Sequence, residues 1–273
     1  MPESAQMVTP AQRKWLPWLT AVGFFMQTLD GTILNTALPN MAETLGESPL
    51  QMQSVVIAYM LTVALLIPAS GWLADRFGTR RIYLAAILLF TLGSLACAAA
   101  NTLPMLVAAR VLQGVGGALL MPIGRLAVLR VYSKHELLRV MSFVTIPGLV
   151  GPLIGPALGG WLVEVASWHW VFLINLPVGI LGFIASWYFM PDLRQGTATF
   201  DWQGFVMFSA GMVLVSVGLQ GLGEHSISTG WALFALLFGL AAMASYWLYA
   251  ANAEEPLFSL ALFKTSTFAI GVW

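Results

Sequence analysis

The chain has 273 residues, of which 59% are hydrophobic and only 9% are charged, and its mean hydropathy is +0.82. Soluble domains carry roughly a quarter charged residues, so a soluble core could not bury this much apolar surface and lipid must cover part of it. The formal net charge is zero, and no basic block indicates a nucleic-acid partner. The single cysteine, Cys97, excludes an intrachain disulfide and a cysteine-based metal cluster. The composition therefore predicts an all-α, polytopic transmembrane helical bundle.

The apolar residues fall into runs long enough for a membrane-spanning helix, which needs about 20 residues. Eight such runs lie near residues 15–39, 53–73, 82–100, 103–124, 140–163, 169–190, 203–222 and 230–250. The first run follows a polar tail and is longer than the roughly 7–15 residues of a signal-peptide core, so we interpret it as an uncleaved span. A ninth run begins near Thr267 and stops at Trp273, too short to cross a bilayer at about 1.5 Å per residue. We expect eight complete spans and an incomplete ninth, as in a fragment.

Basic residues lie on alternate connections between these runs. Eleven of the twelve lysines and arginines occur in the N-terminal tail and in the connections after the second, fourth, sixth and eighth runs. The other connections contain none, and the twelfth, Arg110, lies inside a run. Because loops rich in Lys and Arg remain in the cytoplasm, the N-terminus is predicted to be cytoplasmic. The longer connection at 191–202 is the one predicted domain boundary.

Two charged residues lie inside the apolar runs, Asp30 in the first and Arg110 in the fourth. An ionisable group within a bilayer is costly and is a functional-site candidate. Burial favours the neutral form of a carboxyl, so Asp30 could bind and release a proton. Counting 1.5 Å per residue from the outer helix ends places both residues roughly 10–14 Å below the outer surface, where they could pair. A static ion pair, or an arginine bonded to backbone carbonyls, is the alternative.

The connection at residues 71–81 combines glycines with charged residues. Gly71 and Gly78 allow a tight turn and a close approach of helices. Asp75 is expected to cap free amides at the start of the third helix. The arginines could pair with acids or carbonyls of a neighbouring helix. A turn that only orients the chain in the membrane is the alternative.

Small residues and prolines recur at spacing four along the fifth run. They form two adjacent rows, Gly151, Gly155 and Gly159 in one and Gly148, Pro152, Pro156 and Gly160 in the other. Together the rows predict a flat face that another helix can approach closely. Because prolines remove backbone hydrogen bonds and bend a helix, a flexing element is favoured over a static packing face.

As a set, these segments resemble the major facilitator superfamily, and most closely its fourteen-helix drug:proton antiporters of the multidrug-efflux type. The segments that carry the resemblance are residues 30–39, 71–81, 110–116, 148–160, 168–179 and 201–204. The segments 71–81 and 110–116 resemble superfamily motifs, and 148–160 resembles the antiporter motif. The resemblance spans nearly all of residues 15–270. His169 departs from it, because the family usually has arginine at that position.

The resemblance implies a six-helix N-domain over residues 1–190, two linker helices over 191–250, and a cytoplasmic loop with the start of a truncated ninth helix over 251–273. It implies a secondary transporter, not an enzyme, that exports small amphipathic compounds in exchange for protons across a bacterial inner membrane. No cofactor or metal is implied. The implied partners are the substrate, protons, the bilayer and a C-terminal bundle that this chain lacks, against which the N-domain would rock around a midplane site.

The resemblance also implies roles for particular residues. Asp30 and Arg110 would couple transport to protons. The residues that would gate the cytoplasmic side are Gly71, Asp75, Arg76, Gly78 and Arg80. The residues of the antiporter helix are Gly148, Gly151, Pro152, Gly155, Pro156 and Gly159. No residue is assigned to the substrate.

Two alternatives remain open at this point. The cargo could be a metabolite such as an amino acid, sugar or siderophore, because the motifs indicate fold and coupling and not cargo. The 273-residue chain could also be a non-transporting fragment of such a transporter. An intramembrane enzyme is disfavoured, since His135 and Glu136 are not followed by the second histidine of a metalloprotease helix.

Overall fold

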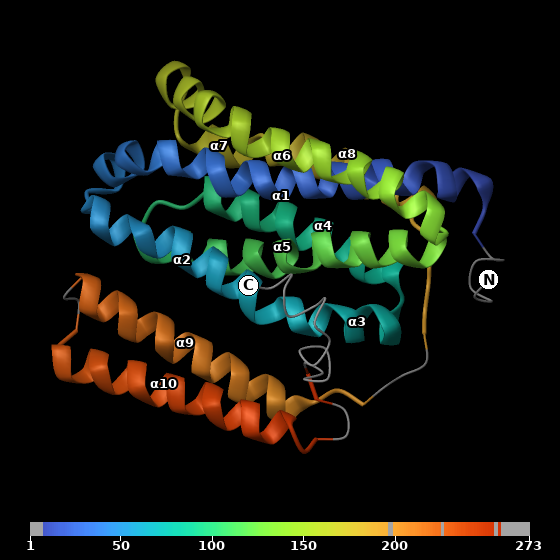
Figure 1. Ribbon diagram of the computed structural model, residues 1–273. Helices are drawn as coiled ribbons and strands as arrows, with labels where there is room; N and C mark the ends of the chain where they lie inside the picture. The colour runs from blue at the N-terminus through green and yellow to red at the C-terminus, as the bar shows by residue number, and fades with distance from the viewer. Residues whose placement is uncertain (1–7, 196–198, 225–226, 254–255, 258–273) are drawn as a thin grey trace. The chain divides into compact units, whose positions relative to one another are not determined.

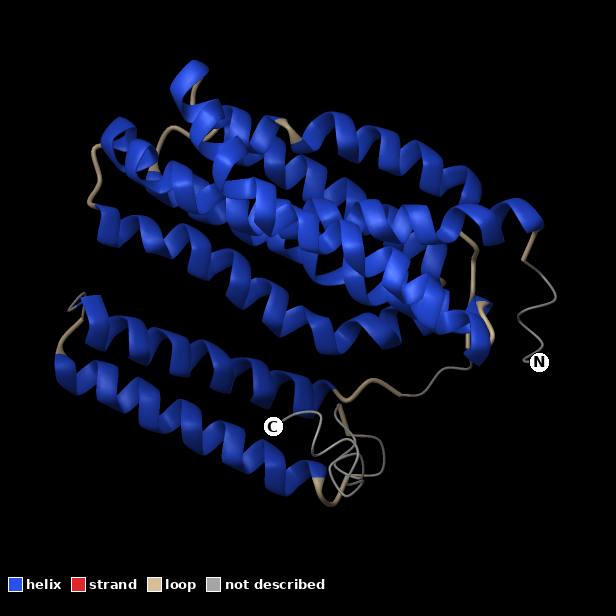
Figure 2. Ribbon diagram, turned by 45° about the horizontal axis from the view of Figure 1, so that its top comes forward, coloured by secondary structure: helices blue, strands red, loops and turns tan. Residues whose placement is uncertain are grey.

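The computed structural model describes residues 8–195, 199–224, 227–253 and 256–257. These residues form helices and loops, and there is no strand among them (Figure 2). The chain divides into two compact units, Met1–Gly196 and Thr197–Trp273. The all-α fold class expected from the composition is confirmed.

The first unit is a bundle of long helices joined by short connections (Figure 1). In chain order its elements are α1 (Pro10–Leu45), α2 (Pro49–Leu66), the 3-10 helix η2 (Ile67–Ala69), α3 (Ser70–Phe77), α4 (Thr79–Ala98), α5 (Leu103–Val131), α6 (Lys134–Val165), α7 (His169–Leu173) and α8 (Asn175–Phe189). Two of the predicted spans are divided, the second by η2 and the sixth by a break at Ile174.

Local sequence signals set several helix ends. Thr9 and Ser48 cap α1 and α2, since each side-chain oxygen accepts from the backbone N–H three residues ahead at 3.2 Å. A proline follows each cap at the first helical position, where its missing N–H costs no hydrogen bond. Between α3 and α4 the chain turns at Gly78, whose φ of +93° suits glycine and whose Cβ, if present, would collide with the side chain of Asp192. Gly71, expected in the same turn, lies instead within α3.

Seven helices of the described part of the chain are long and apolar enough to cross a membrane. They include the composite helices Pro49–Phe77 and His169–Phe189, and the chain is therefore a multi-pass membrane protein. The expected first span, α1, is long enough but is not one of the seven. It is less apolar because it carries the polar residues Gln27, Thr28, Asp30, Thr32, Asn35 and Thr36. Since α1 packs against α2, α5, α6, α7 and α8, protein contacts hold it more than lipid does.

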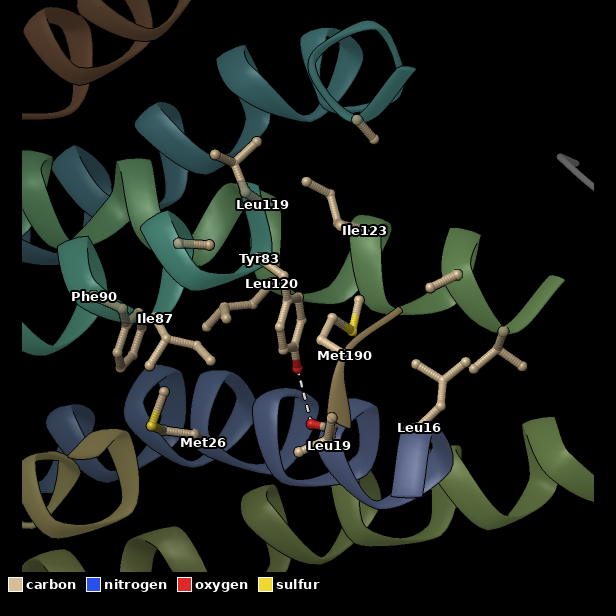
Figure 3. Close-up of a cluster of buried hydrophobic side chains, with 14 of the residues drawn as sticks. Leu16, Leu19, Met26, Tyr83, Ile87, Phe90, Leu119, Leu120, Ile123 and Met190 are labelled. Carbon is tan, nitrogen blue, oxygen red and sulfur yellow. Dashed lines mark hydrogen bonds between the residues drawn. The ribbon is translucent and has the colours of Figure 1, made fainter. Parts of the chain in front are cut away.

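The core of the first unit consists of two apolar clusters at its two ends. One cluster joins α1, α4 and α5 through residues such as Leu16, Phe90 and Ile123 (Figure 3). Within it the Tyr83 hydroxyl donates to the carbonyl of Leu19 at 2.8 Å, which satisfies a polar group that would otherwise be buried without a partner. The other cluster gathers side chains from α1, α2, α5 and α7, among them Ile33 and Phe172.

The most extensive helix contact in the first unit is between α1 and α6. Gly151, Gly155 and Gly159 of α6 face Thr28, Thr32 and Thr36 of α1, one glycine against one threonine on each turn. A Cβ on any of the three glycines would collide with the threonine hydroxyl oxygen opposite. This threonine–glycine seam brings the two backbones close together, as small residues do between membrane helices.

The prediction of one flat face on this helix is wrong. Gly148 belongs with the buried row, where it packs against the ring of Phe24. Pro152, Pro156 and Gly160 are exposed and face away from α1. The two rows lie on different sides because only one row fits the threonines of α1. The helix also continues without a break through its three prolines, from Lys134 to Val165.

The second unit contains the helical hairpin α9 (Trp202–Glu224) and α10 (Thr229–Ala250). The two helices approach closely at Gly211, Gly218 and Gly239, where a Cβ would collide with the opposite helix. Asp201, just before α9, ties the hairpin's open end together by accepting from the Gly204 amide at 2.7 Å and the Tyr249 hydroxyl at 2.9 Å. The incomplete ninth helix predicted from Thr267 lies outside the described residues.

Candidate functional site

Asp30 and Arg110 meet in the interior of the first unit. Asp30 lies on α1 and Arg110 on α5, and Nη1 of the arginine donates to Oδ2 of the carboxylate at 2.6 Å. Each side chain is only 1% exposed. A buried ion pair has lost its hydration, so it is stable only where the geometry is good and further hydrogen bonds satisfy the remaining atoms.

Three uncharged side chains supply those hydrogen bonds. Gln113 and Asn175 both donate to Oδ1 of Asp30, at 2.8 and 2.9 Å. Gln113 also accepts from Nη1 of Arg110 at 2.6 Å. Ser94 accepts from both amides, from Gln113 at 2.7 Å and from Asn175 at 3.2 Å. Asp30, Ser94, Arg110, Gln113 and Asn175 thus form one buried polar cluster, to which α1, α4, α5 and α8 contribute.

Aromatic rings and a backbone carbonyl hold the other sides of the Arg110 guanidinium. Its Cζ lies 4.1 Å from the ring centroid of Tyr59 and 5.9 Å from that of Phe172, distances at which a cation is attracted to an aromatic ring. Its Nε donates to the carbonyl of Val55 at 3.4 Å. The arginine therefore contacts α2 and α7 as well. Together, the residues of the polar cluster and the groups that contact Arg110 lie on six helices of the bundle.

Apolar side chains surround the polar cluster and keep its effective dielectric constant low. One buried apolar cluster contains residues that lie within four positions of Asp30 or Arg110 in the sequence. They are Leu29, Ile33 and Leu34 on α1 and Leu106 on α5. In such surroundings hydrogen bonds and charges interact more strongly than in water, and an unpaired polar group is correspondingly costly. Every hydrogen bond of the cluster therefore matters to its stability.

Asp75 does not cap α4, contrary to the prediction. It lies within α3, which continues to Phe77, and its carboxylate accepts from Nη2 of Arg130 on α5 at 2.5 Å. α4 begins after Gly78 with no side-chain cap. The helix carries Asp75 away from the free amides and toward α5. The same arginine also donates to the Gln195 side chain at 3.3 Å.

The arginines of this loop have different neighbours. Arg76 lies over the rings of Trp72 and Phe77, at 5.5 and 5.9 Å from their centroids. Arg80 donates to the backbone carbonyl of Trp187 at the end of α8. The candidate gating residues Asp75, Arg76 and Arg80 are thus close in sequence but do not form one cluster.

Sequence reasoning missed Ser94, Gln113 and Asn175. Gln113 follows Arg110 by three residues, which places both on one face of α5. Asn175 is the one amide side chain in the sixth apolar run. Those two signals were available, whereas Ser94 is one of many hydroxyl residues in the spans and only the structure distinguishes it.

Nearly the whole chain is similar to one family of known proteins. Residues 20–272 match the Major Facilitator Superfamily. The chain belongs to the major facilitator superfamily. This is a family of transporters and not of enzymes, as the sequence motifs indicate.

Related major facilitator proteins bear a provisional name for multidrug resistance, MdtD. One from Pectobacterium atrosepticum is 55% identical over 270 residues, which are 97% of this chain and 57% of the relative. Another from Klebsiella pneumoniae is 53% identical over 263 residues, 96% of this chain and 56% of the relative. The chain therefore spans a little over half the length of the curated relatives it matches.

Solved transporters share this fold at low sequence identity. The crystal structure of a peptide transporter of the POT type in complex with sulfate aligns with a TM-score of 0.67 at 18% identity, covering 92% of this chain and 56% of the other. A bacterial homologue of the human lysosomal transporter Spinster, in an inward-facing and unoccupied conformation, aligns with a TM-score of 0.57 at 17% identity, covering 89% and 62%. These likenesses concern the fold alone.

Proposed function

We propose that this chain is the N-terminal part of a transporter that exports small amphipathic, drug-like compounds in exchange for protons. The observation that carries the proposal is the buried ion pair of Asp30 and Arg110 in a major facilitator bundle. Asp30 is the single acid within the apolar part of a predicted span. Ionisable residues in membrane spans mark substrate paths and proton relays. The names of the multidrug-resistance relatives support the cargo class.

In the proposed mechanism, a proton on Asp30 cancels the charge that holds Arg110. Gln113 and Asn175 donate to Oδ1 of Asp30, while Arg110 donates to Oδ2, so donors hold both carboxylate oxygens. Protonation leaves the buried guanidinium short of a counter-charge, and α1 and α5 must rearrange to satisfy it. Proton binding would thereby favour a second arrangement of the bundle, which is what coupling requires.

The other candidate residues are assigned supporting roles in the same proposal. The pair of Asp75 and Arg130 would help to close the cytoplasmic side of the transporter, where the basic loops lie. The other candidate gating residues there are Gly71, Arg76, Gly78 and Arg80. The exposed Pro152 and Pro156 side of α6 would face the missing C-terminal bundle. The two helices within residues 191–250 would link the two bundles. The N-terminus would lie in the cytoplasm and the protein in a bacterial inner membrane, in line with the alternation of basic loops.

The test uses the full-length transporter in proteoliposomes and measures substrate-induced proton movement. Asp30→Asn keeps the shape and removes the titration, so it should abolish uphill efflux driven by a pH gradient. Glu164→Gln, which neutralises an exposed acid near the end of α6, is the control and should transport normally. Wild-type proton movement in Asp30→Asn protein would show that Asp30 is structural.

A second variant separates coupling from stability. Asp30→Asn leaves Arg110 buried without a counter-charge, which costs about 3–5 kcal/mol. The double variant with Arg110→Gln removes both charges and should be less destabilised than the sum of the single variants, while remaining uncoupled. Proton movement elicited by amino acids or sugars, and not by cationic amphipathic dyes, would favour the metabolite-exporter alternative.

A further inference from the structure

A groove of about 310 Å³ lies between α1, α4 and α8 on the first unit and includes no member of the polar cluster. Its floor is formed by buried side chains such as Leu19, Met26 and Tyr83, which are labelled in Figure 3. The rim carries the exposed side chains of Trp18 and Leu181. In a membrane-spanning bundle an apolar groove with an exposed rim is in contact with lipid.

Gly182 of α8 leaves part of the groove unfilled. A Cβ built at this position meets no atom of the described residues within 4 Å, so the glycine borders open space. The other glycine of α8 in the groove wall, Gly179, differs because its Cβ would collide with Thr91. The space beside Gly182 can therefore accept a ligand or a larger side chain without displacing the protein.

A polar pocket of about 410 Å³ lies at the adjoining ends of α1 and α4, and the segment after α8 forms the rest of its lining. Gln12 precedes the groove residue Trp15 by three residues on α1, and Arg80 precedes Tyr83 by three on α4. Contacts tie these helix ends together, since Trp15 stacks on Phe189 at 5.5 Å. The charged residues of the pocket are Arg80, Asp192 and Arg194. Asp192 is paired with Arg194 at 3.2 Å, so Arg80 supplies a surplus positive charge.

At the end of the groove nearest the charged pocket lies a buried hydroxyl without a hydrogen-bond partner among the described residues. Ser186 is 1% exposed, lines the groove, and its Oγ has no partner among the described residues. It lies three residues before the end of α8 at Phe189, about 4.5 Å along the helix axis. A buried donor without an acceptor is costly, which indicates that an acceptor from outside the protein completes the site.

We propose that the groove binds one anionic diacyl phospholipid from the leaflet nearest the start of α1. The phosphate lies beside Arg80, an ester carbonyl accepts from the Ser186 hydroxyl, and one acyl chain lies in the groove past Gly182. The charged pocket next to the end of α8, then Ser186, then Gly182 follow one another in the order of phosphate, ester and chain in a phospholipid. Basic pockets between membrane helices are known to receive lipid head groups, and the tryptophans of the rim suit the membrane interface.

The test measures lipid binding to the full-length, delipidated transporter in detergent by native mass spectrometry. The probes are dioleoyl phosphatidylglycerol, which has ester carbonyls, and its diether analogue, which lacks them. The unaltered protein should bind the ester lipid about two- to tenfold more tightly than the diether lipid, as expected for one hydrogen bond. Ser186→Ala should abolish this preference by weakening the binding of the ester lipid alone.

Filling the groove should weaken the binding of both lipids. Gly182→Leu is the test variant, and Gly230→Leu on α10 is the matched control, because a Cβ at Gly230 also meets no atom of the described residues within 4 Å and Gly230 does not line the groove. Equal affinities of the unaltered protein for the two lipids, or equal lipid retention by the Gly182→Leu and Gly230→Leu proteins, would overturn the proposal. The measurement needs no turnover, so its outcome is independent of the proposed transport.

Discussion

At the scale of single residues, the buried polar cluster explains how a carboxylate is tolerated inside the bundle. Oδ2 of Asp30 accepts from Arg110, and Oδ1 accepts from Gln113 and Asn175. Hydrogen bonds to a charged group are worth more than those between neutral groups, so the two amides matter beyond their own packing. Their contribution can be measured separately from that of the ion pair.

We expect Asn175→Leu to lower the free energy of unfolding by about 1–3 kcal/mol, because it removes a donor to a buried carboxylate while keeping the branching of the side chain at Cγ. It should also shift the pH dependence of substrate-induced proton release, since one hydrogen bond to Asp30 is lost. Ser94→Ala is the matched control, because Ser94 contacts the two amides and no charge. Thermal unfolding in detergent and proton release in proteoliposomes are the measurements. Equal effects of the two substitutions on proton release would contradict the role of Asn175.

A second residue-scale prediction concerns Glu136, at the start of α6. The Ser133 hydroxyl and the Arg13 guanidinium donate to its carboxylate, each at 2.6 Å, and they lower its pKa from 4.5 to about 2. Because the pKa is lower in the folded state, the stabilisation is complete above the unfolded value of 4.5 and is lost as the pH falls toward 2.

Glu136→Gln should therefore lower the thermal midpoint by the same amount at about pH 5 and about pH 8, and the difference from wild type should shrink only in stronger acid. Glu164→Gln, an exposed acid on the same helix, should leave the midpoint unchanged. A difference that varies between about pH 5 and about pH 8 would mean that another group titrates with the pair of Arg13 and Glu136.

The sequence could predict the charged half of the candidate site but not the neutral half. Asp30 and Arg110 stand out because charges are rare in apolar runs, and their equal depth followed from helix geometry. Hydroxyl and amide side chains are common in membrane helices, so the role of Ser94 depends on which helices meet. Asp75 was wrongly predicted to cap α4, because the continuation of α3 to Phe77 could not be read from a glycine-rich loop.

At the scale of elements, the threonine–glycine seam determines how closely α1 and α6 approach. Each threonine hydroxyl donates within α1, as Thr32 does to the carbonyl of Thr28 at 2.9 Å, so the hydroxyls need no acceptor on α6. The seam is therefore a contact of shape and not of hydrogen bonds between helices. The stability of the bundle should therefore fall when a substitution adds volume to one helix at this contact. It should recover in part when a second substitution removes volume from the facing helix.

Gly155→Ala should destabilise the bundle by about 1–3 kcal/mol, because the new methyl group collides with the Thr32 hydroxyl oxygen. Thr32→Ala removes that oxygen and should restore part of the loss when the two substitutions are combined. Gly160→Ala, in open space on the same helix, should be neutral or slightly stabilising. These effects can be followed as thermal midpoints in detergent, and the absence of rescue in the double variant would contradict the proposed contact.

Among the elements, the long apolar runs were predictable and their subdivisions were not. Length and hydropathy are enough to locate spans such as α4 and α10, because lipid imposes both. Pro68 lies within η2, and Pro177 follows the break at Ile174 by three residues. Each proline removes a backbone donor, a local signal that the length and hydropathy of a run do not register. The same limit explains the wrong prediction for α6, since both rows recur at spacing four and only the threonines of α1 select one of them.

At the scale of the whole molecule, the arrangement of basic loops leads to a topology that can be tested. A reporter active only in the cytoplasm should be active when fused at Lys134 or Arg194. It should be silent when fused at Glu47 or Glu224, because these positions lie in connections without Lys or Arg. The opposite pattern of activity would invert the proposed orientation of the whole bundle.

The polarity of α1 has a consequence for biogenesis. On the scale of translocon insertion, an aspartate at the centre of a helix costs about 2.5–3.5 kcal/mol, so the bilayer alone holds α1 poorly. Its counter-charge lies 80 residues later in the chain, which at about 5–20 residues per second is a delay of about 4–16 s during synthesis. For that interval the nascent α1 carries an unpaired acid. Its stable integration therefore waits for the arrival of α5, and ribosome-bound chains that end before Arg110 should be extracted from the membrane more easily than longer ones.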